Sequence, residues 1–373
     1  MFTEKLLFKG ILLSIGGGIF ISSAHAQNFD PAIDGLIRNQ ERQAELEKII
    51  QPSADVNLDA VRQKENLKLH EIKEEKCFDI NKVKLNGEMS DKFSKYLTQA
   101  LKELEFKSGM CMGEQAINLL MTKTQNIIIG RGYTTTRILV APQNLSTGKL
   151  ELTVIPGLVR EIKLDLSDED NTRAGRIQYA KNIFPIKNGD VLNLRDLEQG
   201  LENLKRVPTT EADIQIVPAD APNQSDVIVK WKQRKIPIRV TLSADDAGSR
   251  QTGKYQGNIT ASLDNPLFRS DLFYITVGRN LADQQKITDQ NGTTVESGTN
   301  NYALHYSVPY KNWLISANAS QYKYDQAVAG ANNVYNYNGE SKTQDLGVTR
   351  LLYRDAKRKT SASFKGWHRE SKS

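Results

Sequence analysis

The 373-residue sequence predicts two α+β modules followed by the N-terminal part of an antiparallel transmembrane β-barrel. Three observations predict this fold class. Two successive segments of about 80 residues each read as strand, helix, helix, strand, strand. The residues from 235 onward read as strands only, and they hold 15 of the 27 aromatic residues. The connections between these strands alternate between long and short, which is typical of outer-membrane barrels.

The first 26 residues have the pattern of a secretory signal peptide. Lys5 and Lys9 precede or enter the apolar run GILLSIGGGIFI, and an Ala-x-Ala exit predicts cleavage between Ala26 and Gln27. The alternative, a membrane anchor, is disfavoured because about a dozen apolar residues are too few to span a bilayer. Elsewhere the sequence has no apolar run of spanning length, so any membrane residence must come from strands.

Charge and cysteine content narrow the class of protein further. The formal net charge is +6, and the excess of basic residues lies after Arg234. An exported chain rarely meets nucleic acid, so nucleic acid is not an expected partner. Cys77 and Cys111 are predicted to form a disulfide, since export permits one. Two free buried thiols are the alternative.

A lone polar helix and a tether precede the modules. Residues 27–50 predict the helix, with Asp30 as cap and Pro31 at the first helical position. Residues 51–75 carry few large apolar side chains and read as a linker.

The first module is predicted at 76–156 and the second at 157–233. In the first, strands at 77–87, 134–143 and 148–157 surround helices at 90–104 and 113–130. In the second, strands at 159–166, 212–219 and 225–232 surround helices at 171–183 and 193–207. The apolar residues follow a period of 3.6 in the helices and of 2 in the strands.

Residues 235–373 predict seven strands, at 236–244, 254–264, 271–280, 301–309, 312–324, 342–353 and 360–368. Apolar and polar residues alternate in most of them, as expected where one face meets lipid and the other a watery lumen. The connections at 245–253, 281–300 and 325–341 are long, and those at 264–270, 309–311 and 354–358 are short. A soluble β-sandwich also has alternating strands, but it does not require this rhythm or ten of the thirteen tyrosines.

The combined pattern resembles the two-partner secretion transporters, the haemolysin secretion/activation proteins of the POTRA–barrel superfamily. The first module carries the resemblance in CFDINKVKLNG and GYTTTRILVAPQNLSTGKLELTVIPGLVREI. The second carries it in NLRDLEQGLENLKRVPTTEADIQIVPA and SDVIVKWK. The strand region carries it in NPLFRSDLFYITVGRN, YSVPY and TRLLYRD. The likeness extends over nearly all of residues 27–373.

The resemblance implies an outer-membrane pore whose POTRA modules, in the periplasm, capture an unfolded exoprotein: a haemolysin, an adhesin or a contact-dependent toxin. It also implies that residues 27–50 plug the lumen, and that the complete pore is monomeric and surrounded by outer-membrane lipid. A family barrel has about sixteen strands. Seven strands therefore predict a truncated barrel with two open edges, and an incomplete gene model, a frameshifted gene or a deliberate fragment is the expected cause. Gly130–Tyr133 reads GRGY but ends a module helix, so it is not the family's inward loop tip.

Two alternatives stay open: a periplasmic protein-binding module, if only the POTRA part folds, and a barrel-assembly insertase of the same superfamily. No enzyme activity, metal or cofactor is predicted, because the few histidines lie near no nucleophile or carboxylate motif. Tyr133, Arg137 and Leu139, at the start of a first-module strand, are the candidate partner-binding residues. Ordinary sheet and surface packing is the alternative role for them.

Overall fold

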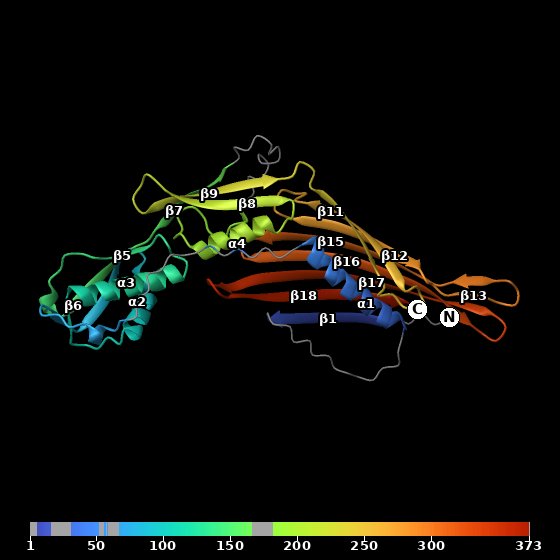
Figure 1. Ribbon diagram of the computed structural model, residues 1–373, viewed down its shortest axis with the longest axis horizontal. Coiled ribbons are helices and arrows are strands. Elements are labelled where there is room, and N and C mark those ends of the chain that lie inside the picture. The colour runs from blue at the N-terminus through green and yellow to red at the C-terminus, as the bar shows by residue number, and fades with distance from the viewer. Residues whose placement is uncertain are drawn as a thin grey trace.

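The computed structural model describes residues 6–15, 31–51, 56, 58, 67–165 and 182–372. The molecule is elongated, with the first module at one end and a large sheet at the other (Figure 1). Helix α1 (Pro31–Ile50) lies against the sheet rather than beside the first module, which follows it along the chain. Within the described residues, none of the helices is long and apolar enough to cross a membrane.

The first module is a three-stranded sheet covered by two helices. Its elements are η1 (Leu69–Glu71), β2 (Phe78–Ile80), β3 (Lys82–Gly87), α2 (Ser90–Glu103), β4 (Met110–Met112), α3 (Glu114–Gly130), β5 (Arg137–Val140), η2 (Leu145–Thr147) and β6 (Lys149–Ile155). Strand β6 is central, parallel to β3 and antiparallel to β5. Leu150, Leu152 and Val154 alternate inward from β6, and they pack against the apolar stripes of α2 and α3. The period-2 and period-3.6 patterns therefore meet in one core.

The second module repeats this topology. It contains β7 (Leu158–Asp165), α4 (Leu194–Lys205), β8 (Thr210–Pro218) and β9 (Gln224–Gln233). Strand β9 is central, parallel to β7 and antiparallel to β8. Helix α4 begins at Asn193, whose side chain accepts a hydrogen bond from the backbone of Arg195. The predicted helix at 171–183 falls almost entirely on residues outside the described part of the chain.

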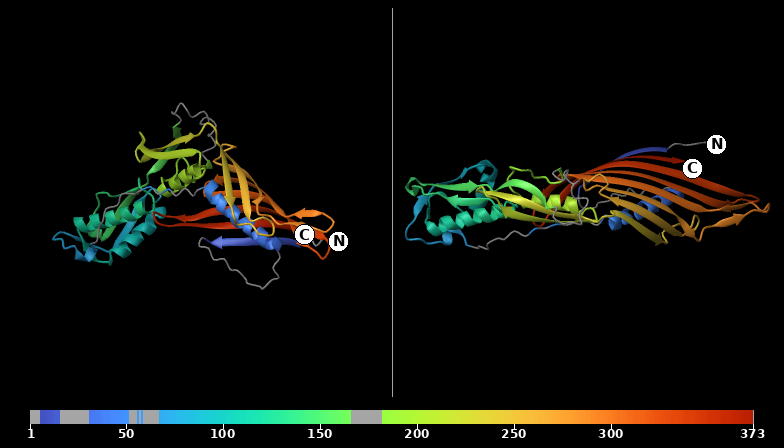
Figure 2. Two further views of the ribbon diagram at one scale, coloured as in Figure 1. Left: turned by 45° about the vertical axis from the view of Figure 1, so that its right-hand side comes forward. Right: turned by 90° about the horizontal axis from the view of Figure 1, so that it is seen from above.

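The large sheet contains the seven predicted strands and one more. They are β10 (Ile238–Asp245), β11 (Tyr255–Asp264), β12 (Leu272–Ala282), β15 (Gly298–Tyr310), β16 (Trp313–Ala329), β17 (Val334–Arg354) and β18 (Lys359–Lys372), with β1 (Leu6–Ile15) outside β18. Every neighbouring pair is antiparallel, and the order follows the sequence from β10 to β18. Figure 2 shows these strands side by side in a curved sheet.

The two faces of the sheet differ in polarity as the alternation predicts. On one face Leu242 is 73% and Ile259 58% exposed. On the other face Thr260, Ser262 and Ser307 are each only 1% exposed. The apolar side chains thus face outward and the polar ones lie on the covered side, which is the arrangement of a membrane barrel and the opposite of a soluble sandwich.

The connections follow the predicted rhythm with one correction. The short turns at 265–271, 311–312 and 355–358 all lie at the end that meets the second module. The long connection after β12 contains a hairpin of β13 (Lys286–Thr288) and β14 (Thr294–Glu296). The prediction of a long loop at 325–341 is wrong, because β16 and β17 stay paired up to Ala329 and Val334. Most side chains of 334–339 are exposed, so this projecting hairpin needs no apolar face and gives no alternating signal.

The outer edge of β18 is paired with an N-terminal segment. Residues Leu6–Ile15 form β1, antiparallel to Ala362–Ser371. Among the described strands the sheet still has two open edges, β10 and β1, each of which pairs on one side alone, so β1 moves the second edge away from β18. An unpaired edge in an apolar environment is unfavourable, so an extended apolar segment is a suitable partner for it. That residues 1–26 form a removable signal peptide stays a prediction.

Candidate functional site

The covered face of the sheet is a continuous polar surface. Thr260 and Thr276 share a hydrogen bond of 2.8 Å across β11 and β12. Asn301 donates to Asn258, and the ring of His305 contacts Ser307 and Asn318 on either side. These polar groups satisfy one another across strands, as buried polar side chains must. The face therefore suits water or a polar chain rather than an apolar core.

Helix α1 binds to this polar face through its own polar side chains. Asn39 is 3% exposed and accepts a hydrogen bond of 3.1 Å from Asn301. Near the other end of the helix, Glu47 accepts a hydrogen bond of 3.0 Å from the hydroxyl of Tyr274. Ile50, fully buried, packs with Leu272 and Tyr274. Contacts along most of its length thus hold α1 against the sheet.

The second module docks on the short-turn end of the sheet through a buried arginine. Arg206, just after α4, donates to the backbone of Ser270 at 3.0 Å and to the hydroxyl of Ser307 at 2.7 Å. Burial lowers the pKa of Arg206 to about 10, so it stays charged at neutral pH. Asp264, fully buried in the same region, accepts two hydrogen bonds of 2.8 Å from Arg239. Module and sheet therefore share one polar interface.

Two glutamates of α4 extend this interface. Glu198 and Glu202 are 0% and 5% exposed, four residues apart on the helix. Arg354, at the end of β17, contacts Glu198 at 2.9 Å and Glu202 at 2.8 Å. Lys359 at the start of β18 pairs with Glu202, and Arg195 pairs with Glu198. Buried carboxylates need such cationic partners. We call Glu198, Glu202 and Arg354 the α4 cradle.

The two modules meet at the GRGY turn that follows α3. The backbone N–H of Leu194 donates to the carbonyl of Gly132 at 2.8 Å. Gly132 has a φ of +97°, and a Cβ there would lie 2.2 Å from Oδ1 of Asn193. Arg131 reaches the sheet, where it donates to the hydroxyl of Tyr353 at 2.8 Å. The turn predicted to end a helix is therefore also the joint between the modules.

The predicted partner-binding residues do not form one surface. Tyr133 is half-buried and packs edge-on against Phe93, at 5.2 Å between ring centroids. Arg137 and Leu139 lie on β5, an edge strand that pairs only with β6, and Leu139 is 47% exposed. Only these two of the three residues therefore lie on an edge that another strand could join.

Part of the free side of β5 is already occupied. The side-chain amide of Gln125 donates to the carbonyl of Thr136 at 2.6 Å and accepts from the N–H of Ile138 at 2.8 Å. Since backbone groups alternate in direction along a strand, the N–H of Leu139 points to β6 and that of Val140 to the free side. Sequence reasoning missed Gln125, because an amide on a helix gives no signal of what it will contact.

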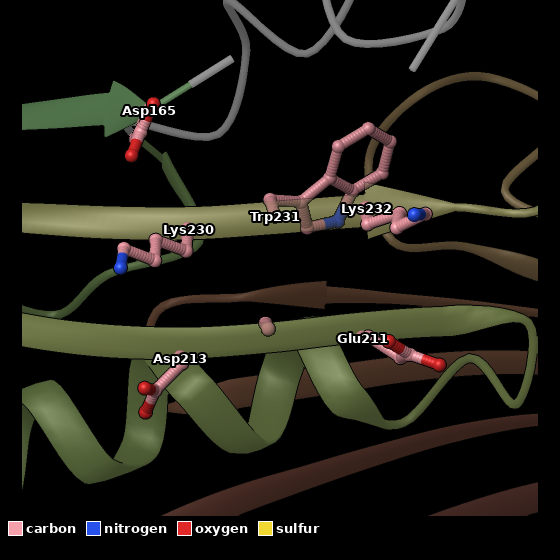
Figure 3. Close-up of a pocket in the computed structure, with 7 residues that line it drawn as sticks. Asp165, Glu211, Asp213, Lys230, Trp231 and Lys232 are labelled. Carbon is pink, nitrogen blue, oxygen red and sulfur yellow. The ribbon is translucent and has the colours of Figure 1, made fainter. Parts of the chain in front are cut away.

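The second module offers a longer free edge at β8, beside a cavity of about 460 Å³. Figure 3 shows Lys230 and Lys232 on β9 and Asp213 and Glu211 on β8 around this cavity. The register pairs Asp213 with Lys230 and Glu211 with Lys232. Opposite charges therefore face each other across the two strands, and the lining holds no nucleophile–base pair.

Cys77 and Cys111 are joined in a disulfide with a Cα–Cα distance of 5.3 Å, within the usual range. It ties the start of the first module to β4. The predicted cleavage site at Ala26 and Gln27 lies outside the described residues. In the described part of the chain, no group of three or more His, Cys, Asp or Glu side chains could hold a metal ion.

The residues that join module and sheet were not found by sequence reasoning. Glu198 and Glu202 follow Leu197 and Leu201 and lie beside the leucine stripe of α4, where charged residues normally face solvent. Arg206 follows the C-terminal end of α4, where basic residues are common, and Arg354 is the last residue of β17. The only sequence signal was the match of the surrounding NLRDLEQGLENLKRV and TRLLYRD stretches to one family.

Family models match most of the described chain. Residues 223–373 match the haemolysin secretion/activation protein ShlB/FhaC/HecB, residues 78–157 match the ShlB-type POTRA domain, and residues 161–218 match a further POTRA domain. The ShlB/FhaC/HecB match begins before β9 of the second module and extends through the sheet, and the further POTRA match ends with β8.

Curated relatives of this chain are named as outer membrane or hemolysin transporters. The outer membrane transporter CdiB-2 of Burkholderia pseudomallei (strain 1026b) is 38% identical over 247 residues, which are 66% of this chain and 39% of the relative. The outer membrane transporter CdiB of Dickeya dadantii (strain 3937) is 26% identical over 90% of this chain and 57% of the relative. The hemolysin transporter protein ShlB of Serratia marcescens is 26% identical over 68% and 42%. The chain thus spans 39–57% of the length of these relatives.

Two solved structures have the same fold. CdiB from Acinetobacter baumannii superimposes with a TM-score of 0.77 at 25% identity, over 93% of this chain and 64% of that one. CdiB from Escherichia coli gives a TM-score of 0.71 at 24% identity, over 92% and 60%. The modules, the sheet and their order are therefore shared.

Proposed function

We propose that this chain, which carries a match to the haemolysin secretion/activation protein ShlB/FhaC/HecB behind two POTRA domains, is a member of that family and serves in the export of a partner exoprotein across the outer membrane. The sheet resides in the outer membrane and the modules in the periplasm. The relatives carry transporter names, and no catalytic role is proposed.

One observation carries this proposal: the large sheet has an exposed apolar face and a covered polar face. The apolar face, with Leu242 and Leu346 at 73% and 67% exposure, suits the hydrocarbon of a bilayer. The polar face suits an aqueous path for an unfolded chain. Because the second module docks at the short-turn end, a polypeptide bound to the modules lies next to the entrance of that path.

Helix α1 acts as a plug in this proposal. It belongs to the same chain as the sheet, and its contacts with Asn301 and Tyr274 cover part of the polar face. A passenger can use that face only where α1 is displaced. A single chain per pore is expected, since the plug and the wall that it covers come from one polypeptide.

The POTRA modules capture the passenger by strand addition at a free sheet edge. Strand β5 offers little of its edge, because Gln125 occupies the carbonyl of Thr136 and the N–H of Ile138. Strand β8, with nine residues, offers more. Proline at Val140 removes an N–H from the free side of β5, whereas proline at Leu139 breaks the pairing with β6. Val140→Pro therefore tests passenger capture at the β5 edge more directly than Leu139→Pro does. Undiminished passenger binding by the Val140→Pro variant would exclude capture at β5.

The export proposal is tested in the producing cell. The protein should partition into the outer-membrane fraction and change its electrophoretic mobility on heating. Deletion of its gene should remove one large exoprotein from the medium and leave other outer-membrane proteins at normal abundance. A general loss of barrel proteins would instead indicate an insertase, and an unchanged medium would contradict export.

A periplasmic binding module is the second candidate. Each module has its own apolar core, one around Phe93 and Leu120 and one around Leu197 and Leu201, which favours folding without the sheet. In that case the full chain should be recovered in the periplasmic fraction without detergent. Recovery only with detergent excludes it.

A further inference from the structure

Between residues 52 and 66 the structure describes Val56 and Leu58, which belong to the linker that joins α1 to the first module. Both contact the second module, and Val56 also contacts the sheet through Arg354. Val56 is 8% exposed and lies in the apolar core of the second module, with Leu58 packed against that core. The linker is thus held six residues after the end of α1.

The α4 cradle holds the backbone of the linker. Glu202 accepts a hydrogen bond of 3.1 Å from the N–H of Val56, and Glu198 accepts one of 2.7 Å from the N–H of Leu58. Arg354 donates to the carbonyl of Val56. In an extended segment the N–H groups of residues i and i+2 and the carbonyl of residue i point to one side. Three side chains therefore replace the edge of a neighbouring strand.

The acceptors of the cradle are positioned by groups outside the linker. Arg354 spans both carboxylates, at 2.9 Å from Glu198 and 2.8 Å from Glu202. Lys359 and Arg195 supply one further cation to each. Because these cations come from the sheet and from α4, they hold the carboxylates in position whether or not the linker is bound.

The chemistry that the cradle recognises is common to all polypeptides. The cradle binds two N–H groups and one carbonyl of the ligand's backbone, and apolar contacts are added for ligand side chains two residues apart. That spacing is the apolar repeat of a β-strand. No charged side chain of the linker takes part in these contacts at Val56 or Leu58. The ligand class is an extended polypeptide with apolar residues at positions i and i+2.

We infer that the α4 cradle is a binding site for extended polypeptide, that the chain's own linker occupies it, and that a segment of the exported polypeptide takes the linker's place. This inference rests on the proposed export function for the identity of its ligand. It assigns to the second module a contact made by buried side chains, distinct from strand addition at a sheet edge.

When a passenger segment replaces the linker at the α4 cradle, the maximum distance that α1 can move from the cradle increases. With Val56 held, Ile50 can move at most about 20 Å from that anchor, given about 3.5 Å per extended residue. With the linker released, its next described residue is Leu67, and the reach grows to about 60 Å. Passenger binding at the cradle therefore gives the plug helix room to leave the polar face.

The test measures binding of a fluorescein-labelled peptide of residues 53–61 to the full chain in detergent micelles, by fluorescence anisotropy. In the native protein the tethered linker competes at an effective concentration in the millimolar range, so binding should be weak. In V56P/L58P the linker lacks both N–H donors. This variant should bind the peptide at least tenfold more tightly than the native chain. Leu67→Pro, a proline at an exposed linker position, should bind like the native chain.

A second peptide, N-methylated at the positions of Val56 and Leu58, should not bind to V56P/L58P, because it offers no N–H to the glutamates. A third, of unrelated sequence with valine and leucine two residues apart, should bind like the first. Equal affinity of the native chain and V56P/L58P, or equal affinity of the methylated and parent peptides, would overturn the inference.

Hydrogen exchange gives a readout that does not depend on the proline variants folding. In the native chain the amides of Val56 and Leu58 should be protected, and saturating peptide should make them exchange at least tenfold faster. Unchanged protection contradicts exchange at the cradle. Both measurements use micelles and no exoprotein, so they are independent of the export assay. If export fails but the peptide binds, only the proposed function is rejected. If export succeeds but the peptide does not bind, only the α4 cradle is rejected as a binding site.

Discussion

The two POTRA modules share one topology but are attached to the molecule in different ways. The second module is joined to the sheet by buried charged groups, with Arg206, Glu198 and Arg354 each nearly inaccessible. The first module contacts its neighbours through the turn at Gly132, through Val191 and Leu158 of the second module, which pack in its apolar core, and through the exposed contact between Arg131 and Tyr353. It also has a disulfide of its own. The comparison teaches that one module is fixed to the base of the sheet by buried charges, whereas the other is held mainly at the end where it meets the second module.

The largest effect is expected where the second module meets the sheet. Arg354→Ala leaves the buried carboxylates of Glu198 and Glu202 without their shared partner, and breaking a buried ion pair costs about 3–5 kcal/mol. Urea unfolding of the full chain in micelles should show this loss. Lys357→Ala, in the same turn but exposed, is the matched control and should change little. A loss below about 1 kcal/mol for Arg354→Ala would show that the interface is not held by these charges.

Loss of the disulfide should lower the stability of the first module alone. Replacing Cys77 and Cys111 by serine removes the constraint on a 34-residue loop, which chain-entropy arguments value at about 3–4 kcal/mol. Hydrogen exchange should accelerate in α2 and α3 while α4 keeps its protection. Equal acceleration in α4 would mean that the modules unfold together.

The addition of a single methyl group at Gly132 should disturb the joint between the modules. Gly132→Ala places a Cβ at a φ of +97° and 2.2 Å from Asn193, so backbone strain of about 1–3 kcal/mol is combined with a clash. Gly189→Ala has a similar φ of +86° but open space around it, and it isolates the backbone strain. Spin-label distances between the modules should broaden in Gly132→Ala only. Identical distributions in both variants would contradict a joint at Gly132.

The smallest effect is a pH dependence confined to the second module. Hydrogen bonds from Arg160 and Lys163 lower the pKa of Asp226 below its ordinary range. A depressed carboxyl pKa stabilises the fold above the unfolded value of about 4, and this stabilisation is lost as the pH falls further. Asp226→Asn should therefore be less stable than the native chain at pH 7, and this difference should shrink as the pH falls from 4 to 2. A difference of unchanged size at pH 2 would point to packing instead.

Much of the fold could be predicted from local patterns. Leu150, Leu152 and Val154 predict a half-buried strand wherever they occur, because the period of two is a property of the extended chain. The leucine stripe of α4 likewise requires a helix. Residues 334–339 gave no such signal, since a hairpin solvated on both faces needs no alternation. The site was less accessible to prediction: Tyr133, Arg137 and Leu139 were treated as one candidate binding group, whereas Tyr133 packs against Phe93 and the other two lie on β5.

By itself the sequence determined the elements of this protein, because strand and helix periodicity, the GRGY turn and the long and short connections are encoded in neighbouring residues. Only the tertiary structure decided which distant groups meet. Glu198 contacts Arg354 across 156 residues, Asn39 contacts Asn301 across 262, and Gln125 covers the strand edge at Ile138. Such contacts depend on how faces are oriented after packing, and a glutamate or an amide on a polar helix face looks the same in sequence whether water or an arginine covers it.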